Sequence, residues 1–315
     1  MKTTDLLGCV GGAASLLLAS TLIPFVGPFF SLLTPLPFLY YSTRLGLFEG
    51  IKLAAIAVAI IGLIAHFAGY PQITLLAFEF SLIGIGLSEL FRRNFSLGYT
   101  IFFAVLFMLL LGLTLLFIIG LSRNMGPIEM ILNYLGSHLN ATIEAYEKAN
   151  VADQNAIELK AYAKAFMATI TQIYPSLMIV GTGFALWLNV VIAKPLFKLR
   201  NLEYPDFIPM DRWQAPDNLV WGLIVAGFAL FLSSGNIEFL AINTLIVISA
   251  IYLFHGLAIV VFFLNKYKVP TWIRFGIYFL IMVQQLFFAV LILAGLFDQW
   301  VDFRKIHRRA ANNST

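Results

Sequence analysis

Ionisable side chains inside long apolar runs are the residues of this sequence best suited to chemistry. Glu79 lies between Phe78 and Phe80 in such a run. A carboxylate at membrane depth is costly enough to be a functional candidate, able to bind a cation, a proton or a substrate amine. The alternative, a carboxylate that snorkels or accepts a hydrogen bond from a neighbouring helix, fits the sequence as well.

Arg44 is a second candidate, because it ends an apolar piece that prolines interrupt. Its guanidinium has the planar geometry that suits a carboxylate or a phosphate. Pro35 and Pro37 make the start of this piece irregular, and irregular backbone at membrane depth is tolerated only against protein or a wet cavity. Residues 24–37 are therefore the first place to look for a binding site, and Gly46 opens the next run with a small residue for close helix contact.

Three polar residues of the later apolar runs complete the candidate ligand-binding set: Asn243, His255 and Gln284. Each of them can line a polar pocket. Amides and imidazoles also serve as hydrogen-bond partners between membrane helices, with contributions of about 0.6–2 kcal/mol. For each residue taken alone, the structural explanation is the more economical one.

Signatures of catalysis are missing from the sequence. It contains no His-Glu-x-x-His pair, no Gly-x-Ser-x-Gly elbow, no phosphate loop and no dinucleotide fingerprint. Cys9 is the sole cysteine, which excludes an intramolecular disulfide and a cysteine cluster. We therefore expect no metal, no cofactor and no enzyme activity. An intramembrane enzyme that acts on lipid through Glu79 and His255 is the weakest alternative.

Composition determines which elements must position these residues. Hydrophobic residues make up 60% of the 315 positions and charged residues 11%, too few to cover a water-soluble domain. Runs such as 101–121 and 240–264 exceed the roughly 20 residues that a helix needs to cross the bilayer, and they are apolar all round, unlike barrel strands. The prediction is an all-α, polytopic transmembrane helix bundle with the lipid bilayer as its first partner.

Nine apolar pieces predict eight to nine spans, because the second and the seventh are short enough to be re-entrant. The pieces are about 6–23, 29–43, 46–67, 73–91, 97–121, 174–193, 219–233, 239–264 and 272–297. Three parts result: a five-span membrane unit at 1–121, a polar insertion at 122–170, and a second membrane unit with a basic tail at 171–315. Apolar residues at three- and four-residue steps make the insertion an amphipathic helix, so residues 127–165 are a candidate site for a protein partner.

Basic residues set the expected orientation in a bacterial cytoplasmic (inner) membrane. They stand singly or in pairs between apolar runs and form no stripe, so we expect no nucleic-acid partner. If nine pieces cross, one group shares a side, which the positive-inside rule makes cytoplasmic: Lys2, Arg44, Arg92, Arg93, Lys194, Lys198, Arg200, Arg212, Lys266 and Lys268. The tail bases then lie opposite, or inside as well if one of the last three pieces does not cross: Arg304, Lys305, Arg308 and Arg309.

Two motifs carry a resemblance to a known family. They are GLFDQWVDFRK at 295–305, and PLP at 35–37 followed by RLG at 44–46. With these motifs the sequence resembles the YybS-like family of bacterial polytopic membrane proteins, and the similarity in span order covers nearly the whole chain. That family brings no established activity, so the resemblance implies a multi-pass fold and names no ligand.

The first of these motifs also has an account from its residues alone. Asp298 and Asp302 stand four apart on one helical face, and Arg304 follows within a turn. Together they can cap and pair the end of the last helix as a structural lock at the membrane edge. A role in binding a ligand or a partner is the alternative.

Two functions of different classes follow. The early part of the chain more loosely resembles the substrate-capture subunits of energy-coupling factor transporters, which favours a component that binds or transports a small molecule. The alternative is a structural or regulatory membrane protein that recruits a partner through 127–165. We favour the first, because the irregular segment and Glu79 are costly features that a scaffold does not require.

Overall fold

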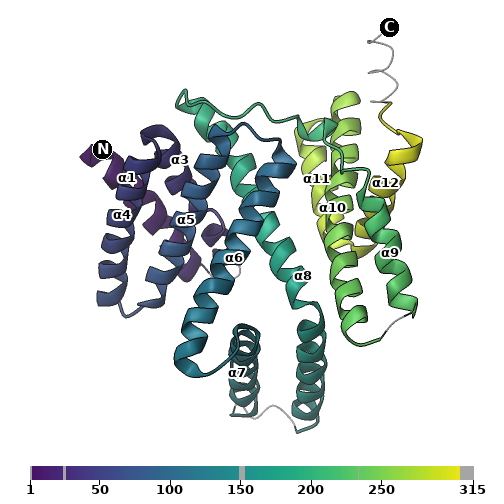
Figure 1. Ribbon diagram of the computed structural model, residues 1–315, viewed down its shortest axis with the longest axis horizontal. Coiled ribbons are helices and arrows are strands. Elements are labelled where there is room, and N and C mark those ends of the chain that lie inside the picture. Colours follow the sequence, from purple (N-terminus) through teal and green to yellow (C-terminus); the bar gives the residue numbers. More distant parts are fainter. Residues whose placement is uncertain (1, 24–25, 149–152, 233, 306–315) are drawn as a thin grey trace. The chain divides into compact units, whose positions relative to one another are not determined.

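The computed structural model describes residues 2–23, 26–148, 153–232 and 234–305, and every regular element in these ranges is a helix (Figure 1). The prediction of an all-α membrane bundle is confirmed. The chain forms two compact units, Met1–Leu115 with Gly181–Phe207 and Leu116–Val180 with Ile208–Thr315. Units 1 and 2 below mean these two. The division at 121 and 170 follows hydropathy and stays a prediction.

Unit 1 is built from two short helices at a proline-rich turn and from longer helices before and after it. Its elements are α1 (Thr3–Leu22), α2 (Gly27–Ser31), α3 (Pro35–Leu45), α4 (Leu47–Phe67), α5 (Gln72–Arg92), most of α6 (Leu97–Arg123) and the end of α8 (Asp153–Leu199). Pro35 begins α3, where a missing N–H costs nothing. Gly46 separates α3 from α4 with a φ of 94°, which only glycine adopts freely.

Helices α3 and α5 approach each other closely at Gly84. A Cβ added there would come within 2.7 Å of the Pro35 carbonyl oxygen and the Leu39 nitrogen. The hydrophobic core of unit 1 extends from this contact, with Phe38 and Leu87 completely buried on the two helices. The proline-bearing segment is therefore held against protein, as irregular backbone at membrane depth requires.

Unit 2 contains the amphipathic insertion and the last helices. Its elements are the remainder of α6 and α8, then α7 (Pro127–Lys148), the 3-10 turn η1 (Met210–Arg212), α9 (Leu219–Leu232), α10 (Asn236–Lys266), α11 (Thr271–Val283) and α12 (Gln285–Val301). Helices α10 and α12 cross at two glycines: a Cβ on Gly256 would overlap the Leu291 carbonyl, and a Cβ on Gly295 would overlap the Tyr252 carbonyl. Small residues thus let two membrane helices touch through their backbones.

Within the described ranges, six helices are long and apolar enough to cross a membrane, and there are up to seven spans if α11 and α12 together count as one. The predicted count of eight to nine is not confirmed. The two short pieces explain the difference, since α3 has 11 residues and α9 has 14. These helices are about 16 and 21 Å long, whereas the hydrocarbon core is about 30 Å thick.

The last apolar stretch, expected as one helix over 272–297, is broken at Gln284. Helices α11 and α12 meet there at 101°, and the Gln284 backbone is extended with φ −99° and ψ 106°. No proline or glycine lies within three residues of the break. Gln284 and Gln285 are its only polar residues.

Hydrogen bonds place the start of α11 and the segment after α12 at the same end of unit 2. Arg274 on α11 donates to the Asn265 side chain at 2.7 Å, and Asn265 donates to Asp211 at 3.2 Å. Arg304, which follows α12, donates to the Asp211 carbonyl at 2.9 Å. We infer that α11 and α12 enter the membrane and return, which puts Arg304 on the side of Arg274. Of the predicted tail bases, Arg308 and Arg309 lie outside the described residues.

Cysteine labelling can test this re-entrant topology in a Cys9→Ala background, because Cys9 is the sole cysteine and is buried. In that background we expect Tyr267→Cys and Phe303→Cys to react with an impermeant maleimide from one side of the membrane. Ser234→Cys, at the other end of α10, is expected to react from the opposite side only. Labelling of position 303 together with position 234 would show that α11 and α12 form one crossing.

Candidate ligand groove

The predicted ligand-binding residues are divided between the two units. Arg44 and Glu79 belong to unit 1, whereas Asn243, His255 and Gln284 belong to unit 2. Within unit 1, Arg44 lines a cavity, and Glu79 lies half-buried on α5 outside it. Gln284 is exposed at the break between α11 and α12. Of the five, Arg44 lines the cavity of unit 1 described next.

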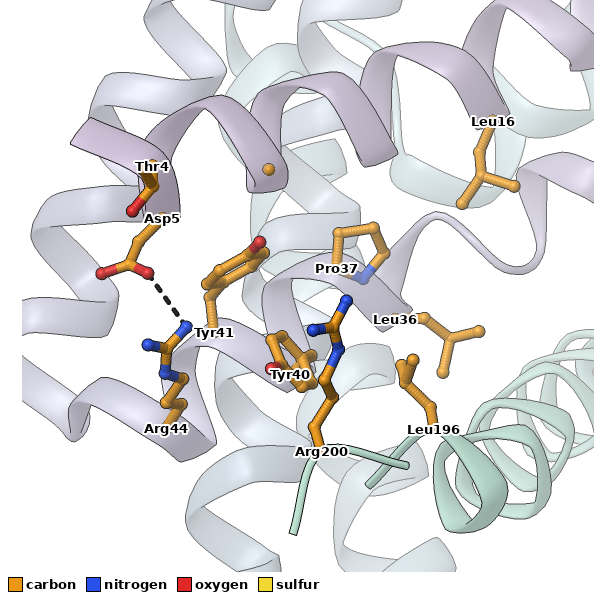
Figure 2. A pocket seen from close by; sticks show the side chains of 11 residues that line it. Thr4, Asp5, Leu16, Leu36, Pro37, Tyr40, Tyr41, Arg44, Leu196 and Arg200 are labelled. Carbon is orange, nitrogen blue, oxygen red and sulfur yellow. Dashed lines mark hydrogen bonds and ion pairs between the residues drawn. The ribbon is translucent and has the colours of Figure 1, made fainter. Parts of the chain in front are cut away.

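The cavity of unit 1 has a volume of about 530 Å³ and lies between α1, α3 and the end of α8 (Figure 2). We call it the α1–α3–α8 groove. Its lining residues are Thr4, Asp5, Gly8, Leu16, Leu36, Pro37, Tyr40, Tyr41, Arg44, Leu196 and Arg200. Pro37 and Arg44 come from the segment that the sequence pointed to, and Arg200 comes from the other end of the unit's sequence.

Small residues of α1 form one wall of the groove. A Cβ on Gly8 would overlap the Tyr41 hydroxyl, and a Cβ on Gly12 would lie 3.1 Å from the Pro37 ring. These two contacts, with the Asp5–Arg44 ion pair, show that α1 and α3 run antiparallel. Glycines at these positions let the side chains of α3 pack directly against the backbone of α1, and the groove lies beside these contacts.

Two guanidiniums and one carboxylate line the groove, which gives it a net charge of +1. Arg44 donates to the buried Asp5 carboxylate at 3.0 Å, so that arginine's charge is largely balanced. Among the residues that the structure describes, no carboxylate pairs with Arg200. Figure 2 shows its guanidinium turned toward Pro37, beside the Tyr40 ring.

The end of α8 fixes where Arg200 stands. Helix α8 ends at Leu199, and two residues later Asn201 has a φ of 52°, a left-handed conformation that asparagine tolerates. The chain then folds back, and the Tyr204 hydroxyl donates to the Val190 carbonyl at 2.8 Å. Burial raises the pKa of the Tyr204 phenol, which keeps it a neutral donor. Arg200 is thus held by a short, anchored turn.

A second polar cluster lies in unit 2, where Asp298 and Arg304 form an ion pair at 2.8 Å with both side chains inaccessible to solvent. His255 joins them, because its Nε2 lies 3.0 Å from Asp298 Oδ2 and 2.8 Å from Arg304 Nη2. Nε2 thus lies beside both an acceptor and a donor, and its hydrogen-bond role depends on which ring nitrogen carries the hydrogen. Nδ1 is buried with no hydrogen-bond partner among the described residues.

Arg304 also ties the preceding loop to this cluster. Its Nη1 donates to the carbonyl oxygens of Asp211 and Trp213, at 2.9 and 3.0 Å. Asp302 ends α12 in a left-handed conformation, with its amide bonded to the Asp298 carbonyl at 2.9 Å. The motif that we interpreted as a structural lock thus has contacts of that kind, a buried ion pair and bonds to the preceding loop. His255 also belongs to the cluster, and the spacing in the sequence did not indicate it.

The family of the chain follows from its similarity to known proteins. Residues 13–299 match the profile of a family described as "Predicted membrane protein (DUF2232)". The chain belongs to this family. Across 287 residues, 90% of each chain, it is also 23% identical to "Uncharacterized protein YybS" of Bacillus subtilis (strain 168). The predicted relation to YybS-like proteins is confirmed, and no solved structure matches this DUF2232 chain.

The DUF2232 match covers most of both polar sites. Arg44 and Arg200 of the groove lie within residues 13–299, as do His255 and Asp298. Arg304 lies beyond the matched range. The likeness to substrate-capture subunits is not tested by these comparisons and stays a prediction.

Asn243 of this DUF2232 protein has a structural partner on α8. Its side chain meets α8 one residue after Pro175, an interior proline that disrupts the helix's own hydrogen bonds. Asn243 Oδ1 accepts from the Ser176 N–H at 2.9 Å, and its Nδ2 donates to the Gln172 carbonyl at 2.8 Å. A third bond joins Nδ2 to the Phe239 carbonyl at 2.8 Å. Both amide hydrogens are thus used within the protein.

In unit 1, the side chain of Asn189 donates to a backbone carbonyl of the proline-bearing segment. Its Nδ2 donates to the Leu32 carbonyl at 2.7 Å, just before Pro35. The Leu36 amide bonds to Leu33 at 3.0 Å, so the chain here is a tight turn and the Leu32 carbonyl needs another donor. An asparagine inside an apolar run was the only signal of this role in the sequence.

Proposed function

We propose that this DUF2232 protein is a multi-pass protein of the bacterial cytoplasmic membrane that binds a small anionic molecule in the α1–α3–α8 groove. The observation that carries the proposal is the Arg200 guanidinium, which faces a cavity of about 530 Å³ without a carboxylate partner among the described residues. Binding of this kind is the step that a substrate-capture component performs. The proposal involves no catalytic step.

The roles of the two arginines differ. Arg200 supplies the net attraction, because a guanidinium offers several N–H donors to a carboxylate or phosphate in a fixed geometry. Arg44 is held by Asp5 at 3.0 Å, so it offers its remaining donors at a fixed position. Tyr40 and Tyr41 line the same space. Glu79 lies outside the groove and has no part in the proposal.

Replacing Arg200 by glutamine is expected to lower the affinity for an anionic ligand about 10-fold to 100-fold, because the substitution removes a charge-assisted hydrogen bond. The measurement is binding of small phosphates and carboxylates, screened by thermal stabilisation of purified protein and followed by calorimetry. Lys198→Gln, an exposed base on the last turn of α8, is the matched control. Equal affinities in the two variants would remove Arg200 from the site and contradict the proposal.

Partner recruitment through 127–165 stays a prediction. Helix α7 exposes Ile128 and Tyr134, and α8 exposes Tyr162 and Phe166. Lipid covers such side chains as well as a protein does. Deletion of 127–165 is expected to abolish recovery of a partner while the rest of the bundle still folds.

A further inference from the structure

The lining of the α1–α3–α8 groove changes character along its length. Thr4 and Asp5 stand at the start of α1, whereas Leu16 lies 12 positions further on, about 18 Å along the helix. Along α3 the order is reversed, with Leu36 near the first turn and Arg44 in the last. Because the two helices are antiparallel, both place their polar residues at one end and their apolar residues at the other.

Helix α8 repeats this gradient. Arg200 follows its last residue, and Leu196 lies one turn earlier. In Figure 2, Arg200 lies between the ionic end marked by Asp5 and Arg44 and the apolar end marked by Leu16 and Leu36. Three helices thus give the groove a charged end and walls of leucine and proline beyond it.

A fully hydrated solute does not suit such a groove. A small polar anion needs polar partners around most of its surface, and the apolar half of the lining offers none. An amphiphile needs donors at its head and apolar contacts along its tail, which is the order found here. The groove also runs along the helix axes, which is the direction of lipid chains in a bilayer.

We propose that the ligand of the groove is an anionic amphiphile, a single-chain lipid with a phosphate or carboxylate head. The head lies at Arg200 and Arg44, and the chain runs past Leu36 and Leu196 toward Leu16. This inference rests on the proposed function and specifies its ligand class. For ligand taken from water, each buried methylene is expected to strengthen binding about fourfold.

The experiment compares four probes on the purified full-length protein: inorganic phosphate, glycerol 3-phosphate, lysophosphatidic acid and lysophosphatidylcholine. The first two carry the anion without a chain, and the last carries the chain without a net charge. We expect lysophosphatidic acid to bind at least 10-fold more tightly than the other three. Arg200→Gln is expected to erase its advantage over lysophosphatidylcholine.

A tryptophan at the apolar end tests the path of the chain. Leu16→Trp is expected to lower the affinity for lysophosphatidic acid at least 10-fold and to leave the affinity for glycerol 3-phosphate unchanged. Leu18→Trp, on the exposed face of α1, is the control, and Leu196→Trp replaces Leu16→Trp should that variant fail to fold.

The outcomes separate the two proposals. If glycerol 3-phosphate binds as tightly as lysophosphatidic acid and depends on Arg200, the amphiphile is wrong and the anion site stands. If lysophosphatidic acid binds equally well to the wild type, Arg200→Gln and Leu16→Trp, the lipid lies elsewhere and both proposals fail.

Discussion

Replacing Arg304 by methionine is expected to lower the free energy of unfolding by about 3–5 kcal/mol. The substitution leaves the Asp298 carboxylate buried without its counter-charge and removes the donor to the Asp211 and Trp213 carbonyls. An uncompensated buried charge costs far more than the lost contact alone. Unfolding in mixed micelles with increasing SDS measures the change. Arg212→Met, an exposed arginine of the adjoining turn, is the control and is expected to be nearly neutral.

A triple variant separates charge burial from packing. Replacing His255 by phenylalanine, Asp298 by leucine and Arg304 by methionine removes the buried ion pair together with the imidazole that contacts it. We expect this variant to recover part of the stability that Arg304→Met loses, because no unpaired charge remains. If Arg304→Met is as stable as Arg212→Met, the buried ion pair is not part of the folded protein in solution.

The sequence identified Asp298, Asp302 and Arg304 of this cluster but did not connect His255 to them, for a physical reason. Asp298, Asp302 and Arg304 are neighbours along the chain, so helical spacing alone predicts their proximity. His255 is 43 residues from Asp298, and the two meet only because Gly256 and Gly295 let α10 and α12 touch. The spacing of residues along the sequence carries no information about which two helices cross.

Span count was the weakest part of the fold prediction. Apolar length correctly identifies the class, because backbone groups in lipid must be satisfied by the helix itself. It does not reveal where a helix stops inside an apolar run. The break at Gln284 has no proline or glycine beside it, and α3 and α9 are helices too short to cross alone. Tertiary contacts determined these features.

The groove shows the same limit. Arg44 could be found, because the prolines before it mark irregular backbone. Arg200 was interpreted only as a base that sets orientation, since its surroundings in the sequence are those of any membrane-edge loop. Its place beside Pro37 and Tyr40 depends on the return of α8 to α1 and α3. Convergence of distant segments is a property of the fold.

Buried asparagines follow a rule that the sequence did not show. Asn189 serves a carbonyl near Pro35, and Asn243 serves both backbone groups beside Pro175. Prolines release backbone groups that lipid cannot satisfy, and an asparagine from another helix supplies the missing partners. In each unit, a proline break and a buried amide therefore form one structural feature.

This pairing makes Asn243→Leu the second strongly destabilising change. It leaves the Ser176 N–H and the Gln172 carbonyl without a partner in an apolar surrounding, at about 1–3 kcal/mol for each group. We expect a loss of about 2–5 kcal/mol in the free energy of unfolding, measured in the same SDS titration. Asn236→Leu, exposed at the start of α10, is expected to change little.

Pro175→Ala distinguishes a repaired proline break from a general interhelical contact. In the Asn243→Leu background, alanine restores the N–H at position 175 and lets α8 join Ser176 to Gln172 by itself. The double variant is therefore expected to regain most of the stability that Asn243→Leu loses, whereas Pro175→Ala alone gains little because Asn243 already serves both groups. Additive effects of the two substitutions would mean that the amide stabilises α10 independently of the proline. Strong coupling is expected, because the same two backbone groups are satisfied in either of two ways.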